Sequence, residues 1–158
     1  MSALTDFSLR KALGRDVPQM YDLLMAGAEK GLLLPRSKAQ LFTALRDFFV
    51  LEDRETGILA GCCALAIIAD GLTEVRSLFV SEAYRRKGLG HILVKACLED
   101  AAFFGFTQVF TLTYQTGFFA ALGFQEVPKE TLPQKIWTDC IHCTKFPNCD
   151  EIAMIRSV

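Results

Sequence analysis

The chain has 158 residues, enough for one domain with a substantial buried core, and we predict a single domain over residues 1–158. Hydrophobic residues make up 51% of the sequence and charged residues 22%, a globular composition without a bias toward disorder. The formal net charge of -1 argues against nucleic acid as the main partner.

The N-terminal stretch has no basic segment followed by an apolar run, so we expect no signal peptide. The longest nearly apolar run, Ile58–Ala69, is too short to span a bilayer and is typical of a buried strand. Cys62 and Cys63 lie in this run and should face opposite sides of the strand, whereas Cys97 lies on a later helix. We expect all three to be small core residues in a reducing compartment, which predicts a cytoplasmic protein with no membrane partner.

The first elements are a strand over residues 7–12 and a helix that Asp16 caps, with Pro18 in its first turn, ending at Gly31. Ser37 is expected to cap a second helix over residues 38–48.

Two further helices are predicted, one from residue 88 to about 104, closed by a glycine, and a short one near 116–122. The remaining predicted strands are residues 48–52, 58–69, 73–80, 107–114, 124–127 and 151–155. The resulting order, βααβββαβαββ, is that of an α/β protein whose mixed sheet has helices on both faces.

The stretch S-E-A-Y-R-R-K-G-L-G (residues 81–90) places three cations and two glycines between a predicted strand and a predicted helix. Backbone N–H groups at a helix N-terminus attract anions, and glycines let a ligand approach them closely. The pattern predicts a seat for a phosphate or pyrophosphate. An exposed basic turn is the alternative, whereas a Walker loop is excluded because no Gly-Lys-Ser/Thr follows. A dinucleotide fold fits poorly because a meander precedes the motif.

The longer stretch V-R-S-L-F-V-S-E-A-Y-R-R-K-G-L-G-H-I-L resembles the acetyl-CoA motif of the GNAT N-acetyltransferases, Q/R-x-x-G-x-G/A, with Arg85, Gly88 and Gly90 at its defined positions. F-F-A-A-L-G-F (residues 118–124) is similar to the second landmark of that superfamily, an aromatic residue followed by Leu-Gly-Phe. The resemblance implies the GNAT acyl-CoA N-acyltransferase fold, with the sheet splayed between residues 73–80 and 107–114. It also implies acetyl-CoA as co-substrate.

In that superfamily one strand offers backbone groups to the pantetheine arm, and the following loop wraps the pyrophosphate. The cofactor-binding residues that the resemblance implies here are Leu78, Phe79, Val80, Arg85, Arg86, Lys87, Gly88, Leu89, Gly90 and His91.

The segment G-L-L-L-P-R-S-K-A-Q-L (residues 31–41) resembles N-acetylglutamate synthases, and residues 112–124 and 132–137 are similar to short glutamate acetyltransferases. The implied reaction is acetylation of the α-amine of a small acidic amino acid, L-glutamate, which is the first step of arginine biosynthesis. Arg36 occupies the substrate-arginine position of that family and could hold a carboxylate bidentately. Arg76, Ser77 and Lys135 are candidates for a second carboxylate contact, with ordinary surface roles as the alternative.

Glu74 stands where several GNAT enzymes have their general base, and it could remove the ammonium proton through a water. The alternative is a structural carboxylate paired with Arg76. The usual acid, a tyrosine, is replaced by Phe119, and Tyr114 is the nearest substitute unless it too is structural.

Cys140, Cys143 and Cys149 resemble three ligands of a zinc site, with His142, Asp139 or Asp150 as a fourth. The alternative, reduced thiols packing over the last hairpin, is the one we adopt, so no metal is predicted.

Two other functions stay open at this stage. The chain could be a GNAT enzyme for another amine, such as a different amino acid, a polyamine, a drug or a protein N-terminus. It could also be a non-catalytic module that binds acetyl-CoA as a signal. The predicted partner is a small-molecule amine, and the oligomeric state is left open, a homodimer included.

Overall fold

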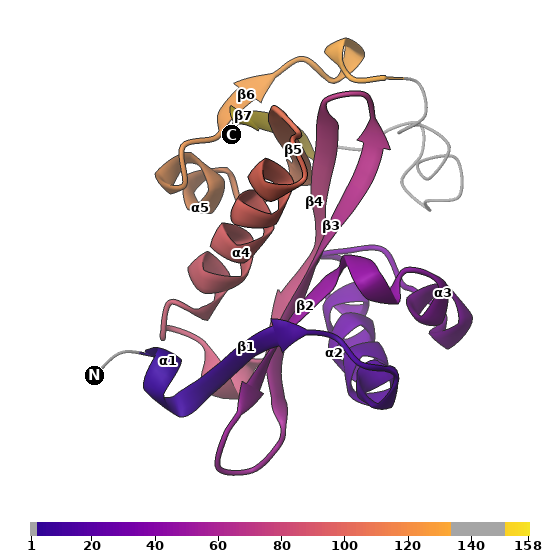
Figure 1. The fold of residues 1–158 in the computed structure, drawn as a ribbon, viewed down its shortest axis with the longest axis vertical. Helices are drawn as coiled ribbons and strands as arrows, with labels where there is room; N and C mark the ends of the chain where they lie inside the picture. Colours follow the sequence, from indigo (N-terminus) through magenta and orange to yellow (C-terminus); the bar gives the residue numbers. More distant parts are fainter. Residues whose placement is uncertain (1–2, 134–150) are drawn as a thin grey trace. The chain divides into compact units, whose positions relative to one another are not determined.

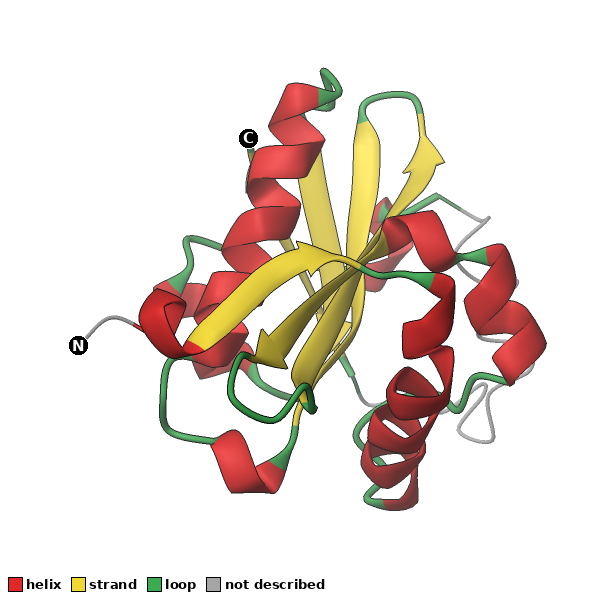
Figure 2. Cartoon of the chain, turned by 60° about the horizontal axis from the view of Figure 1, so that its bottom comes forward, coloured by secondary structure: helices red, strands yellow, loops and turns green. Residues whose placement is uncertain are grey.

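The computed structural model describes residues 3–133 and 151–158, and their course is shown in Figures 1 and 2. The helices are α1 (Ala3–Asp6), α2 (Val17–Glu29), α3 (Lys38–Thr43), α4 (Leu89–Phe103) and α5 (Thr116–Ala121). The strands are β1 (Phe7–Lys11), β2 (Phe48–Asp53), β3 (Leu59–Ala69), β4 (Leu72–Val80), β5 (Gln108–Thr113), β6 (Gln125–Val127) and β7 (Ile152–Ser157).

In the described part of the chain these strands form one mixed sheet in the order β1-β2-β3-β4-β5-β7-β6. Strands β4 and β5 are parallel, whereas the β1–β2, β2–β3, β5–β7 and β6–β7 pairs are antiparallel. The predicted α/β class and element order are therefore confirmed. Helix α1 and the short 3₁₀ turns between elements were not predicted.

The chain divides into two compact units, and strands β3 and β4 contribute to both. The first unit contains Met1–Leu65 and Ser77–Cys97, and the second contains Ala66–Arg76 and Leu98–Val158. The expectation of a single domain over residues 1–158 stays a prediction.

The first unit buries side chains on both faces of its strands. On one face, Cys62 of β3 packs in a core with Met20 and Leu24 of α2. On the other face, Cys63 contacts α4, since its sulfur lies 3.7 Å from that of Cys97. All three cysteines are buried and none of them is in a disulfide, and their predicted placement is confirmed. Burial raises the pKa of the Cys62 thiol to about 12 and also raises the pKa of Cys63, which keeps both as thiols.

The second unit has its own core around β5. Phe110, fully buried, packs with Leu72 of β4, Ala153 of β7 and Leu132, which follows β6. The β5–β7 register places Phe110 opposite Ile155 and extends over all of β5. Because this strand pairs on both sides and is covered by apolar side chains, it provides a rigid support for the segment that follows it.

Two predicted helix caps had different outcomes. Ser37 caps α3 as expected, since its hydroxyl accepts from the Gln40 N–H at 3.1 Å and the Gln40 side chain accepts from the Ser37 N–H at 2.8 Å. The capping role of Asp16 was wrong: its carboxylate makes no bond to α2. It accepts instead from the Arg10 guanidinium at 2.7 and 2.9 Å and from the Leu13 N–H.

A buried carboxylate is stabilised more by a bidentate guanidinium than by one backbone N–H, which is the physical reason for this difference. Burial alone would raise the pKa of Asp16, but the hydrogen bonds from Arg10 and Leu13 outweigh it, so its pKa lies below the usual value.

Two helical glycines allow a direct test of packing at α2. A Cβ on Gly27 would lie 2.9 Å from Cδ1 of Phe79 on β4 and 3.1 Å from Leu33, whereas a Cβ on Gly117 in α5 would meet nothing within 4 Å. Gly117→Ala should therefore gain up to about 1 kcal/mol of helix propensity. Gly27→Ala should lose about 1–3 kcal/mol through overpacking. Urea unfolding followed by circular dichroism measures both, and equal gains would mean that the contact with Phe79 is soft.

Candidate active site

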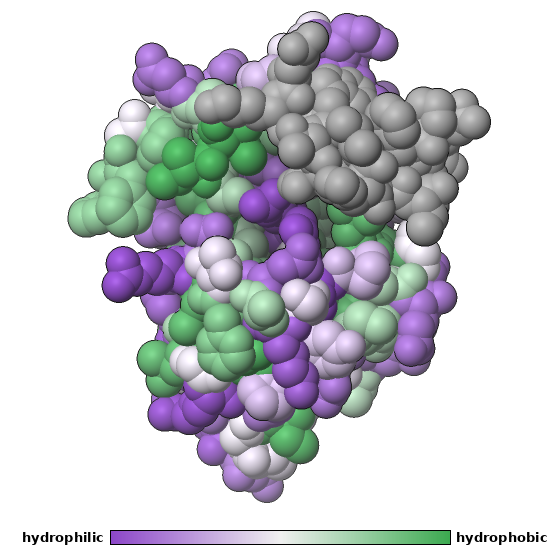
Figure 3. Space-filling model, turned by 90° about the vertical axis from the view of Figure 1, so that its right-hand side faces the viewer, coloured by the Kyte–Doolittle hydropathy of each residue, from purple (hydrophilic) through white to green (hydrophobic). Residues whose placement is uncertain are grey.

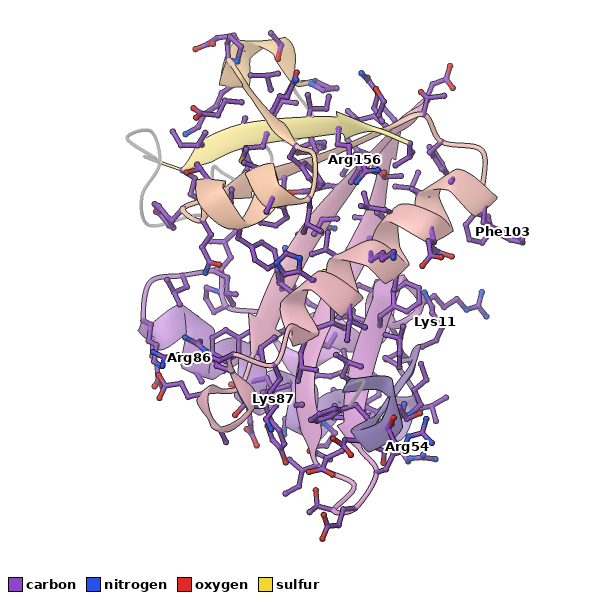
Figure 4. The ribbon with its side chains drawn as sticks, turned by 90° about the vertical axis from the view of Figure 1, so that its left-hand side faces the viewer. Lys11, Arg54, Arg86, Lys87, Phe103 and Arg156 are labelled. Atoms are coloured by element: carbon purple, nitrogen blue, oxygen red, sulfur yellow. The ribbon has the colours of Figure 1, made fainter. Side chains whose placement is uncertain are left out.

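The loop between β4 and α4 has the backbone shape of an anion-binding site. Arg86 (φ 65°) and Gly88 (φ 74°) are both left-handed, on either side of Lys87. Alternation of left- and right-handed residues forms a concavity of N–H groups, and the first turn of α4 adds N–H groups without partners inside the helix. The exposed Arg86 and Lys87 lie where the chain enters this helix (Figure 4). The backbone N–H groups and cations of this loop could bind a phosphate group.

Side chains from three other segments fix the residues that lead into this loop. The Tyr84 hydroxyl donates to Asp53 on β2 at 2.9 Å, and the Tyr84 ring packs edge-on against Phe7. Glu82 forms an ion pair with Lys30 at the end of α2. The hydrogen bond with Tyr84 lowers the pKa of Asp53, and the same bond raises the pKa of Tyr84. The start of the loop is thus held by contacts from β1, β2 and the end of α2.

Strand β4 contains a left-handed residue, Ser77, with φ 55°. A non-glycine residue in this region is uncommon in a strand, and such outliers concentrate at functional sites. Its carbonyl lies 3.7 Å from the Cys62 sulfur on β3, within the first unit. Because Cys62 stays a thiol, it can donate a weak hydrogen bond that holds this irregularity. The contact of Cys62 with the Ser77 carbonyl and the left-handed conformation of Ser77 were not predicted from the sequence.

In the second unit, the parallel ladder between β4 and β5 is short. It pairs Leu72 with Gln108, Thr73 with Val109 and Glu74 with Phe110, where it ends in the described chain. Just beyond it, the buried Thr111 hydroxyl donates to the Val75 carbonyl at 2.9 Å. A side chain therefore satisfies a carbonyl after the ladder has ended. The role of Thr111 was not predicted from the sequence. The signal that could have indicated it is a polar residue within an otherwise apolar strand.

Glu74 and Arg76 lie together in the second unit. They occupy alternate positions of β4 and so share one face of the strand. The distance between Oε1 of Glu74 and Nη1 of Arg76 is 3.5 Å, and Glu74 is largely buried. A structural carboxylate paired with Arg76 was the alternative to a general base for Glu74. The contact also fixes the direction of the carboxylate.

The Leu-Gly-Phe landmark forms the C-terminal cap of α5. The Phe124 N–H donates to the Phe119 carbonyl and the Gly123 N–H to the Ala120 carbonyl, with Gly123 left-handed at φ 88°. The Phe119 and Phe124 rings are in contact, 5.2 Å between centroids, and the Arg156 guanidinium (Figure 4) donates to the Leu122 carbonyl at 2.6 Å. Phe119 is buried in this cap and has no proton to give.

The remaining predicted residues are placed as follows. Tyr114, half-buried, follows β5 directly in the second unit, and Arg36, half-buried, precedes the Ser37 cap in the first. Lys135, Cys140, Cys143 and Cys149 lie outside the described residues. In the part of the chain that is described, His, Cys, Asp and Glu side chains form no group able to hold a metal ion.

The family of GNAT acetyltransferase domains matches residues 44–126, which include the loop before α4 and the α5 cap. An uncharacterized N-acetyltransferase of Chlorobaculum tepidum is 39% identical over 97% of this chain and 97% of its own. The chain belongs to the GNAT acetyltransferase family. Acetyl-CoA is the co-substrate of these enzymes, so the predicted fold and co-substrate are both confirmed.

Two further relatives bear on the type of GNAT acetyltransferase. An amino-acid acetyltransferase of Mycobacterium tuberculosis is 35% identical over 75% of this chain and 68% of its own length. The structure of N-acetylglutamate synthase from Neisseria gonorrhoeae, complexed with coenzyme A and N-acetylglutamate, superimposes with a TM-score of 0.86 at 28% identity. It covers 96% of this chain, which in turn spans 35% of that protein.

Figure 3 shows hydrophilic and hydrophobic side chains intermingled on one face of this GNAT acetyltransferase. Among the described helices, none combines the length and the apolar character that a membrane crossing requires.

The loop geometry predicts how acetyl-CoA binding depends on Gly88. Valine is strained at φ 74°, at a cost of about 1–2 kcal/mol or more, so Gly88→Val should reshape the loop and weaken acetyl-CoA binding at least tenfold. Lys87→Ala removes only a screened surface charge and should weaken binding up to about fivefold. Isothermal calorimetry on the two variants shows whether acetyl-CoA binding depends more on the loop backbone or on its charge. Equal losses of affinity would indicate a merely electrostatic site.

Proposed function

We propose that this GNAT acetyltransferase transfers the acetyl group of acetyl-CoA to the α-amine of a small acidic amino acid, L-glutamate. The observation that carries the proposal is the likeness, at a TM-score of 0.86, to an N-acetylglutamate synthase complexed with its product. The sequence similarity to an amino-acid acetyltransferase over 75% of the chain supports the same substrate class. The reaction would then belong to arginine biosynthesis in the cytoplasm, a reducing compartment that suits Cys62, Cys63 and Cys97, none of which is in a disulfide.

Arg36 is the residue we assign to a glutamate carboxylate. It immediately precedes Ser37, whose reciprocal hydrogen bonds with Gln40 fix the backbone at the start of α3. A guanidinium held on an ordered helix start can form two parallel bonds to a carboxylate at a small cost in entropy. Arg76, Ser77 and Lys135 are proposed for the second carboxylate. Arg76 would share its guanidinium between Glu74 and the substrate.

The chemistry that we propose is direct attack of the amine on the thioester. The substrate arrives as an ammonium ion, and Glu74 accepts one proton from it through a water. The neutral nitrogen forms a bond to the acetyl carbonyl carbon. The resulting oxyanion collapses, the carbon–sulfur bond breaks and coenzyme A leaves as the thiolate. The second proton on nitrogen goes to solvent, and the thiolate is protonated by Tyr114 or by water, since Phe119 has no hydroxyl.

If Glu74 is the base, Glu74→Gln should lower kcat about 10²–10⁴-fold and flatten the acidic limb of the pH profile. Acetyl-CoA affinity should change little. Steady-state kinetics from pH 5 to 9, with calorimetry for acetyl-CoA, measure both effects. Arg76→Ala serves as a comparison, because it removes the ion-pair partner and leaves the carboxylate in place. Turnover of Glu74→Gln at the wild-type rate would assign Glu74 to the structural pair alone.

Arg36→Ala should raise the KM for glutamate about ten- to a hundredfold through loss of a charge-assisted bidentate contact, with the acetyl-CoA KM nearly unchanged. Arg36→Lys should restore only part of the loss, because it brings the charge without the fork. Arg54→Ala is the matched control, since Arg54 is an exposed arginine on the β2–β3 hairpin (Figure 4).

A survey of thiol release with the twenty amino acids tests the substrate itself. Glutamine keeps the α-carboxylate and loses only the distal charge, so it should be used poorly if Arg76 or Lys135 contacts the distal carboxylate. Unchanged glutamate kinetics in Arg36→Ala, together with equal use of glutamine, would reduce the proposal to acetylation of an unspecified amine.

A further inference from the structure

The side chain of Arg85 folds back onto the strand that precedes it. Its Nε donates to the Val80 carbonyl at 3.1 Å, and its guanidinium carbon lies 5.3 Å from the centroid of the Phe79 ring. All three residues belong to the first unit. Arg85 therefore contacts β4 itself, although its position in the loop suits it to a phosphate.

The direction of the Val80 carbonyl follows from its peptide bond. The N–H of Ser81 donates to the Ala60 carbonyl on β3 at 2.8 Å. In a trans peptide the C=O and the N–H point in opposite directions, so the Val80 carbonyl points away from β3. This is the edge of β4 along which, in the described chain, pairing with β5 has already ended at Glu74. Arg85 thus donates to the Val80 carbonyl on an edge of β4 where strand pairing has ended.

The Phe79 ring gives Arg85 a fixed surface on which to rest. The ring is 5% exposed, and a Cβ added to Gly27 of α2 would come within 2.9 Å of it. The Phe79 carbonyl points toward β3, since an added Cβ on Gly61 would meet it at 2.9 Å. A guanidinium over an aromatic face is favourable even at a partly exposed site. Arg85 therefore has a defined position before any ligand is present.

We propose that Arg85 is a displaceable latch on the edge of β4 that receives the pantetheine arm. The inference rests on the proposed cofactor site at Leu78–Val80 and the following loop. A pantetheine amide N–H that pairs with the Val80 carbonyl takes over the acceptor that Arg85 holds. The released guanidinium then turns to the pyrophosphate in the loop. The loss of one hydrogen bond is offset by a charge-assisted one, so that the arm and the phosphates bind cooperatively.

The latch makes opposite predictions for two acetyl donors. S-acetylpantetheine has the arm but lacks the pyrophosphate and nucleotide, so it must displace Arg85 without any phosphate contact in return. Arg85→Ala should bind S-acetylpantetheine about three- to tenfold more tightly than wild type, because the Val80 carbonyl is open. The same variant should bind acetyl-CoA about tenfold more weakly, because a charge-assisted phosphate contact is lost. Calorimetry and the KM of each donor in acetyl transfer report both values.

Two further variants separate the latch from simpler roles. Lys87→Ala, the matched control, removes a neighbouring exposed cation and should weaken acetyl-CoA while leaving S-acetylpantetheine unchanged. Phe79→Leu keeps an apolar side chain but removes the aromatic face. It should strengthen S-acetylpantetheine binding in the same direction as Arg85→Ala and to a smaller extent.

Each other outcome overturns the latch in a recognisable way. Weaker binding of both donors to Arg85→Ala would make Arg85 a structural support of the strand. Weaker acetyl-CoA with unchanged S-acetylpantetheine would make it a phosphate contact only. If neither Arg85→Ala nor Gly88→Val changes acetyl-CoA binding, the proposed cofactor site itself fails along with the latch.

Discussion

The parallel ladder between β4 and β5 joins three residue pairs and ends at Glu74 and Phe110. Beyond that point the backbone of β4 needs other hydrogen-bond partners, because an unpaired strand edge is costly when it is shielded from water. The Thr111 hydroxyl serves the Val75 carbonyl and the Arg85 guanidinium serves the Val80 carbonyl. Both donors are side chains, and a side chain can move away from a carbonyl more easily than a neighbouring strand can. The end of this ladder thus leaves carbonyls of β4 to side-chain donors, and the proposed pairing with the pantetheine arm relies on the one that Arg85 occupies.

The elements that could be predicted are those with local causes. Ser37 and Gln40 form a capping box four residues long. Leu122, Gly123 and Phe124 form a helix end whose backbone N–H groups all donate to carbonyls of α5. The alternation of β3 placed Cys62 and Cys63 on opposite faces without knowledge of their partners. The loop between β4 and α4, which we propose for the cofactor, also has a local signal, because its cations and glycines are adjacent in the sequence.

What could not be predicted depends on partners distant in the sequence. Asp16 stands before α2 as a cap would, but a bidentate contact with Arg10 attracts its carboxylate more strongly. Nothing about a serine in the sequence predicts the left-handed conformation of Ser77. Its carbonyl lies near the Cys62 thiol on the neighbouring strand, a partner distant in the sequence. The pairing of Glu74 with Arg76 could be stated only as one of two alternatives, because spacing places both on one face without fixing their rotamers.

The contact between Gly27 and Phe79 limits how this chain can vary. Helix α2 approaches β4 so closely that the Phe79 ring and Leu33 fill the space that a side chain at Gly27 would need. A larger residue at one position therefore requires a smaller one at another, and the two changes must occur together or pass through an overpacked intermediate. Since the same ring supports Arg85, sequence drift in the buried face of α2 would change the strand edge before any residue of the loop had been substituted.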